Sequence, residues 1–267
     1  MRHDNTDGFW RTLLLGQEHA RPTRKLRRAC KNQKYNVARV WRNTRYDDSG
    51  IERLIRLTLV WMQWLTGGLW VRHLADVVPK ESNLQTRKLW VEGYVLFKLA
   101  LPIIFLFSKV TGSGIVAFVA AYMASETVVY LASLIFLSNE FAEPISSRRS
   151  LVTLFINYVQ VSLDYAVVYS HYSINIKGFL SQDLEVPVKA IYFSFVTSAT
   201  VGYGDIYPCT EGGWLLVVSQ IILFLVFVAL FINFFAAKLQ SNYHITNPKK
   251  RVKPWTPRKP WKKSDED

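Results

Sequence analysis

Hydrophobic residues are concentrated in four long blocks in the later two-thirds of the chain. The blocks span about residues 90–110, 114–137, 151–172 and 214–237. An α-helix rises about 1.5 Å per residue and the hydrocarbon core of a bilayer is about 30 Å thick, so a crossing helix needs about 20 apolar residues. Each block meets that length. The pattern therefore predicts an all-α membrane protein with four transmembrane helices.

A fifth apolar stretch, residues 57–71, is harder to assign. It has only 15 residues, and Gly67 and Gly68 interrupt it. Its three tryptophans suit a helix that lies in the membrane interface, where aromatic rings sit at headgroup depth. We predict such an interfacial helix over 54–71. The alternative is a short core helix in a cytoplasmic subdomain.

A short helix and a polar loop are predicted between the third and fourth blocks. Pro187 is a good first-turn residue, and the helix is expected over 186–199. It is too short to cross a bilayer, so the chain must return through residues 200–205 as non-helical backbone. Such backbone is tolerated at membrane depth only where it is buried in protein or lines a watery cavity. We therefore expect a re-entrant helix and a loop that lines a pore.

The charge distribution adds a topology to this pattern. The net charge is +13, and residues 1–56 carry 14 basic against 6 acidic side chains while residues 238–267 carry 9 against 3. Basic ends that flank apolar blocks predict that both termini are cytoplasmic, and four crossings return the chain to one side. A basic composition is also compatible with nucleic-acid binding. The placement of the charge instead favours contact with anionic lipid at the cytoplasmic face, and we expect no nucleic-acid partner.

These patterns divide the chain into four parts. Residues 1–89 form a basic cytoplasmic N-terminal region and 90–137 a transmembrane hairpin. Residues 151–237 are expected to form a pore domain with an outer helix, a pore helix, the pore-lining loop and an inner helix. Residues 238–267 form a basic cytoplasmic tail.

The loop after the short helix has the sequence TVGYGD at residues 200–205. Glycines at alternate positions can adopt positive φ, so successive carbonyls can be turned to the same side. A row of carbonyl oxygens can replace the water shell of a cation. The stretch TxxTVGYGD, followed by a proline and placed behind a short helix between two spans, resembles the selectivity filter of potassium channels. The resemblance covers about residues 150–237.

The resemblance implies a function and a set of site residues. The function is passive, potassium-selective conduction across the cell membrane by a homotetramer, because one chain supplies only one filter strand. It implies neither enzyme activity nor a cofactor apart from K⁺ as the permeant ion. The filter would consist of Thr200, Val201, Gly202, Tyr203 and Gly204, with K⁺ bound at the first four, and Asp205 and Tyr207 would lie at the outer mouth.

The positions behind the filter depart from the pattern of the family. Tyr192 and Phe193 replace a usual pair of tryptophans, and Val196 stands where some bacterial channels have a buried glutamate. Together with Thr197 these residues are the expected support of the filter. A tyrosine hydroxyl can still donate to Asp205, but we expect fewer hydrogen bonds here. A weakly selective cation channel and a non-conducting membrane scaffold or sensor are the alternative functions.

Two charges lie inside the predicted hairpin. Lys98 is 14 residues before Gly112 in the turn, and Glu126 is 14 residues after it. A lone charge at the bilayer centre costs about 2.5–3.5 kcal/mol on insertion scales, so we predict that the two side chains pair at equal depth. Alternatively, Lys98 snorkels and Glu126 faces another subunit. A further charge, Asp164, is expected near the outer end of its span, where it would contact the pore loop.

Three phenylalanines near the inner end of the last span can be read in two ways. Phe231, Phe234 and Phe235 would form a hydrophobic constriction that gates by dewetting, or they would pack against lipid and other subunits. No span has arginines at every third position, so the common voltage-sensing pattern is absent. The spacing of His, Cys and carboxylate residues predicts no metal site.

Overall fold

The computed structural model describes residues 29–42, 50–77, 84–137 and 147–246. Within these ranges the chain is helical, and the one β-type pairing is an isolated bridge between Leu180 and Pro208. The predicted all-α fold class is confirmed.

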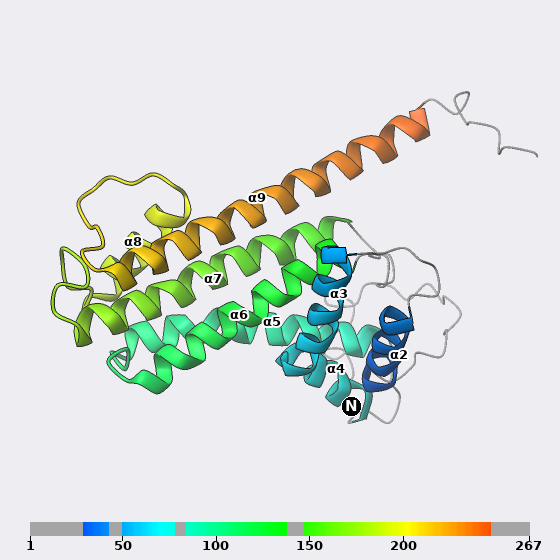
Figure 1. Cartoon of the computed structure of the whole chain (residues 1–267), viewed down its shortest axis with the longest axis horizontal. Coiled ribbons are helices and arrows are strands. Elements are labelled where there is room, and N and C mark those ends of the chain that lie inside the picture. The colour runs from blue at the N-terminus through cyan, green and yellow to red at the C-terminus, as the bar shows by residue number, and fades with distance from the viewer. Residues whose placement is uncertain (1–28, 43–49, 78–83, 138–146, 247–267) are drawn as a thin grey trace, which may run out of the picture.

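Among the described residues, four helices are long and apolar enough to cross a membrane (Figure 1). They are α5 (Leu84–Phe107), α6 (Gly114–Phe136), α7 (Ser147–Asn175) and α9 (Glu211–Thr246). Their membrane-compatible segments are Leu89–Phe107, Gly114–Phe136, Leu151–Asn175 and Glu211–Ile232. These segments match the four predicted spans to within a few residues, and they support a multi-pass membrane protein.

Helix α7 lies at the centre of the helical bundle of one chain. It packs against α5, α6 and α9, and also against the short helix α8 (Pro187–Ser198). In contrast, α5 and α9 leave most of their apolar side chains uncovered within one chain. Large apolar residues of α9 such as Leu215, Ile222 and Leu225 are more than half exposed. One chain therefore offers broad apolar faces to lipid or to further protein.

The remaining helices lie at two opposite ends of this bundle (Figure 1). At one end, α8 lies beside α7 and α9. At the other end lie α2 (Ala29–Arg42), α3 (Gly50–Met62), the short 3₁₀ helix η1 (Gln63–Leu65) and α4 (Gly67–Val77). Helix α9 begins at the α8 end and runs toward the side where α2 to α4 lie. The two ends of the bundle thus have different structures.

The predicted single helix over 54–71 is instead two helices, α3 and α4, joined by η1. The chain breaks at Thr66, whose backbone is extended (φ −81°, ψ 132°) and whose hydroxyl donates to the Gln63 carbonyl. Just after the break, the Gly68 N–H donates to the Glu126 carboxylate of α6 over 2.9 Å. A helix N-terminus is a favourable place for a carboxylate, and this contact explains the break. The interfacial position of the segment stays a prediction.

Small residues allow α8 to lie close against α7. Ala166 of α7 and Ala190 of α8 have no exposed surface, and they share a core cluster with Tyr169 and Phe193. Side chains without a long stem let the two backbones approach, since protein interiors are close-packed. The position of α8, and of the loop that follows it, depends on this contact.

Replacement of Ala190 by leucine should overpack the contact between α7 and α8 and destabilise the fold by about 1–3 kcal/mol. Thermal unfolding of the purified chain in detergent measures the effect. Ala121→Leu is the matched control, because Ala121 is an exposed alanine of α6. Equal midpoints for the two variants would show that the contact is not close-packed.

Candidate functional site

Helix α8 is held by buried hydrogen bonds from both neighbouring long helices. The Ser194 hydroxyl donates to the Ser162 carbonyl of α7 over 2.5 Å. Gln220 of α9 donates from Nε2 to both the carbonyl and the hydroxyl oxygen of Ser194, at 3.0 and 2.8 Å. The Tyr169 hydroxyl donates to Gln220 Oε1 over 2.9 Å. Because all four residues are buried, these bonds fix the depth and rotation of α8.

Ser194, Gln220 and Tyr169 were not among the residues that the sequence singled out. Each has its partner on another helix at least 25 positions away. Buried polar groups are expected to find hydrogen-bond partners. The signal available in the sequence was therefore the polarity of Gln220 within the most apolar span.

The TVGYGD loop, residues 200–205, leaves α8 with an alternating backbone. Thr200, Gly202 and Gly204 have positive φ values of 54°, 58° and 79°, while Val201 and Tyr203 between them do not. Glycine adopts this conformation readily, but Thr200 is a β-branched residue for which it is unfavourable. Because φ alternates in sign, successive peptide groups are rotated so that their carbonyl oxygens can face the same side. A row of like-facing carbonyls requires this rotation.

Two backbone hydrogen bonds hold the start of the loop. The Thr200 N–H donates to the Thr197 carbonyl over 3.1 Å, and the Val201 N–H donates to the Val196 carbonyl over 3.0 Å. The predicted supports Val196 and Thr197 therefore act here through their main chains. Beyond Val201 the loop is exposed in one chain, and the Tyr203 side chain is 70% accessible.

Tyr192 connects α8 to the far end of the loop. Its hydroxyl donates to the Asp205 carboxylate over 2.9 Å, and this hydrogen bond raises the pKa of the Tyr192 hydroxyl. Its ring lies parallel to that of Tyr203, with centroids 6.4 Å apart. Phe193 points the other way, because it is buried edge-on against Tyr169. Of the two residues in place of the usual tryptophans, one contacts the loop and the other anchors α8.

The chain beyond the loop is tied to the segment that precedes α8. The Tyr207 N–H donates to the Ser181 hydroxyl, and the Ser181 N–H donates to the Tyr207 carbonyl. Gln182 Nε2 donates to the Asp205 carbonyl over 3.0 Å. The Tyr207 side chain itself stays about half exposed. Both ends of the loop are thus fixed, and its middle is open on one side.

In a comparison with protein families, residues 152–241 match a family model described as ion channel. The chain carries an ion channel domain. The matched segment includes nearly all of α7, the whole of α8, the TVGYGD loop and most of α9. No curated protein and no solved structure matches the chain. The domain supports passive ion conduction.

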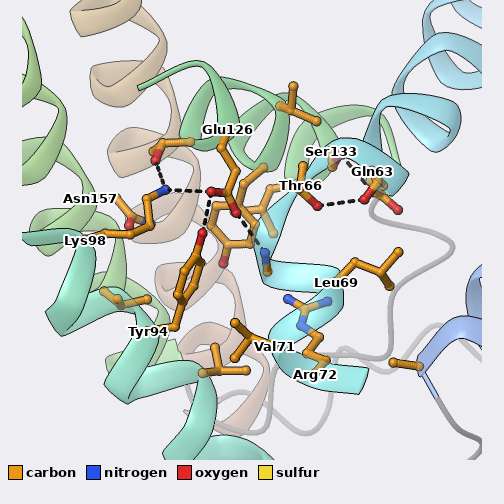
Figure 2. Close-up of a pocket in the computed structure, with 18 of the residues that line it drawn as sticks. Gln63, Thr66, Leu69, Val71, Arg72, Tyr94, Lys98, Glu126, Ser133 and Asn157 are labelled. Carbon is orange, nitrogen blue, oxygen red and sulfur yellow. Dashed lines mark hydrogen bonds and ion pairs between the residues drawn. The ribbon is translucent and has the colours of Figure 1, made fainter. Parts of the chain in front are cut away.

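The charged pair predicted in the hairpin lies outside the ion channel domain. Lys98 Nζ is 3.6 Å from Glu126 Oε2, and both side chains are buried (Figure 2). The Tyr94 hydroxyl donates to Glu126 over 2.6 Å, and Lys98 donates to the Thr127 hydroxyl over 2.7 Å. The structure thus brings Lys98 and Glu126 together, and with the Gly68 N–H it adds partners that sequence spacing alone did not reveal.

Asp164 extends this polar group into the ion channel domain. It has no exposed surface and accepts a hydrogen bond from Gln160, one turn earlier on α7. Gln160 Oε1 in turn lies 2.9 Å from the Thr127 hydroxyl of α6. The second carboxylate oxygen of Asp164, Oδ1, has no hydrogen-bond partner within the described residues. In that part of the chain no hydrogen bond joins Asp164 to the TVGYGD loop, so the expected contact with the pore loop is not seen.

Phe231, near the inner end of the last predicted span, packs against a buried cluster that includes Leu154, Leu223 and Phe227. This position favours packing over a constriction. The side chains of Phe234 and Phe235 lie outside the described residues. Within the described ranges, His, Cys, Asp and Glu side chains form no group that could hold a metal ion.

The buried pair predicts a non-additive double-mutant cycle. Lys98→Met and Glu126→Gln should each destabilise the protein by about 3–5 kcal/mol, because each leaves its partner buried without an opposite charge. The double variant should lose much less than the sum, and unfolding of all variants in detergent provides the comparison. Lys109→Met, at an exposed lysine beyond α5, is the control. Strictly additive losses would show that the two charges do not interact.

Proposed function

We propose that the protein is a potassium-selective ion channel that conducts K⁺ passively through a homotetrameric pore. The observation that carries the proposal is the alternating φ pattern at Thr200, Gly202 and Gly204 within the TVGYG sequence. It occurs directly after a short helix, in the segment that matches the ion channel model. The resemblance to a potassium filter and the backbone conformation of the loop therefore support the same function.

The proposed ion path uses main-chain oxygens. The carbonyls of Thr200, Val201, Gly202 and Tyr203, with the Thr200 hydroxyl, would replace the water around K⁺, and Gly204 would let the chain turn outward. Carbonyl dipoles stabilise a cation without binding it as tightly as a full charge would. An ion can therefore enter and also leave. The side chain of Tyr203 would face away from the path.

Four copies are needed because one loop can cover only one side of an ion. The exposed side of the loop and the uncovered apolar face of α9 in one chain support an assembly around a shared axis. Homo-oligomers commonly close by rotational symmetry, and the family resemblance points to four subunits. Four Asp205 carboxylates would then surround the outer entrance and raise the local cation concentration.

The proposed setting is the cell membrane, with both termini in the cytoplasm. Helix α9 and helices α2 to α4 reach the same side of the molecule (Figure 1), which agrees with an even number of crossings. The basic residues of 1–56 and 238–267 would lie against anionic lipid, at about 1 kcal/mol for each basic residue close to the surface.

Gly202→Ala should abolish K⁺ flux from liposomes that contain the purified protein. Alanine at φ 58° costs about 1–2 kcal/mol in each copy, so the loop would relax and its carbonyls would turn away. Wild-type flux should be blocked by barium and should exceed sodium flux. Gly178→Ala is the matched control, because Gly178 also has positive φ (71°) but lies in a turn before α8.

Three results would contradict the proposal. Unchanged flux in Gly202→Ala would show that ions do not pass along this backbone. Equal sodium and potassium flux in the wild type would favour the weakly selective cation channel. Silence of the wild type at varied voltage, pH and calcium would favour the non-conducting scaffold or sensor.

Tyr192→Phe should shorten the time for which the pore conducts. The variant removes the hydroxyl that donates to Asp205, so the outer end of the loop loses a side-chain tie to α8. We expect K⁺ current to decay several-fold faster in planar bilayers, with selectivity retained. Tyr172→Phe, at a tyrosine of α7 whose ring stacks on Phe179 and not on a residue of the loop, should behave as wild type. Identical decay in the two variants would remove Tyr192 as a support of the filter.

A further inference from the structure

A pocket of about 350 Å³ lies outside the proposed ion path, at the α2 to α4 end of the bundle (Figure 2). Its walls come from α2, η1, α4, α5, α6 and α7. The pocket is therefore formed where the N-terminal helices meet the hairpin and the first helix of the ion channel domain. The volume is in the range of small-molecule sites, and the conduction of ions does not use it.

Two buried amide side chains face this pocket without hydrogen-bond partners in the described part of the chain. Asn157 of α7 is 5% exposed and Asn36 of α2 is 7% exposed, and both line the cavity. Each amide offers two N–H donors and one acceptor. Together they supply, from α2 and α7, hydrogen-bonding capacity that the protein itself does not use.

The charged groups of the pocket are already occupied. Lys98 is paired with Glu126 and donates to Thr127, while Glu126 also accepts from Tyr94 and from the Gly68 N–H. Arg72, on the α4 wall, has an interaction of its own. A ligand with a net charge would have to break these interactions or be buried without a counter-charge, which is costly. The free capacity is therefore for a neutral group.

The rest of the lining is mostly apolar. Valine and leucine side chains come from three of the helices that form the walls: Leu69, Val71, Val91, Val95, Val129 and Leu134. An apolar ligand body would gain about 25 cal/mol for each Å² removed from water. Apolar walls with a few convergent polar groups are the usual form of a small-molecule site.

We propose that this pocket binds a small amphipathic molecule with an uncharged hydrogen-bonding head, such as an alcohol or a primary amide. The head pairs with the amides of Asn157 and Asn36, and the apolar body lies along the valine and leucine wall. The chemistry of the lining, with two unpartnered amides and charged groups that already have interactions of their own, assigns this class of ligand.

The pocket also has a physical connection to the ion channel domain. Asn157 lies on α7, one turn before Gln160, and Gln160 contacts Thr127 and Asp164. The same helix carries Ser162, whose carbonyl accepts from Ser194 of α8. A ligand that orders the Asn157 side chain therefore acts on the helix that positions α8. Its effect on ion flux rests on the proposed function, whereas its binding does not.

Photolabelling of the full chain in lipid nanodiscs tests the binding. The probe is an octanol that carries a diazirine, and adducts are located by mass spectrometry of peptides. We expect adducts on the segments of α5 and α6 that contain Tyr94 and Glu126. Asn157→Leu removes the amide and narrows the cavity, so it should reduce this labelling at least fivefold. Phe155→Leu is the matched control, since Phe155 is a mostly exposed residue of the same helix.

A second variant and a second measurement keep the test decisive. Asn36→Leu, from the α2 wall, should lower labelling in the same way and covers the case in which Asn157→Leu does not fold. Labelling that is equal in all variants, confined to exposed faces of α5 and α9, or absent from the wild type would overturn the proposal. Excess 1-octanol should also change K⁺ flux in the wild type more than in Asn157→Leu. A protein that is labelled as expected but carries no K⁺ would contradict the proposed function and support the binding site.

Discussion

In the proposed channel, the need to satisfy non-helical backbone inside a membrane is the constraint on which the ion channel domain depends. Lipid offers no hydrogen bonds, so a loop at that depth must be held by the protein. The TVGYGD loop is held at its start by the carbonyls of Val196 and Thr197 and at its end by Tyr192 and Gln182. Its middle forms no such bonds with the described residues, and the backbone there alternates in φ. An ion and three further copies of the chain are the partners that would complete it.

Helix α7 connects the segment that holds this loop to the rest of the protein, because it contacts α8 as well as α5 and α6. On one face it accepts the Ser194 hydroxyl of α8 and packs against Ala190. On another it carries Gln160 and Asp164, which continue the polar group of Lys98 and Glu126. Buried polar groups are expensive unless they are paired, so their pairings fix the relative positions of helices that apolar packing alone would leave free to slide. The hairpin and the channel domain are connected through α7 for this reason.

Much of the fold could be predicted from the sequence because it follows from apolar length. Four runs of about 20 apolar residues can be little other than crossing helices, and Pro187 marks the start of α8 within one residue of the prediction. The equal distances of Lys98 and Glu126 from the turn also indicated a contact that the structure contains. These features depend on local composition or on simple counting along a hairpin.

The features that could not be predicted depend on contacts between distant residues. The break between α3 and α4 at Thr66 comes from a carboxylate 60 positions later in the chain. The bonds among Tyr169, Ser194 and Gln220 require three helices to be placed first. The same holds for the pocket, whose walls come from six elements, and for the left-handed backbone of Thr200, which is not a residue that favours it. The residues of the loop could be named from the sequence, whereas the means by which the protein holds them could not.

The central claim is that four copies of this loop surround a row of ions. A structure of the full chain in lipid, determined with rubidium as the permeant ion and with its anomalous signal recorded, tests it most directly. The account predicts a tetramer with rubidium peaks on the symmetry axis, beside the carbonyls of Thr200, Val201, Gly202 and Tyr203. A monomer, or a tetramer whose loops carry no rubidium and whose carbonyls point away from the axis, would contradict it.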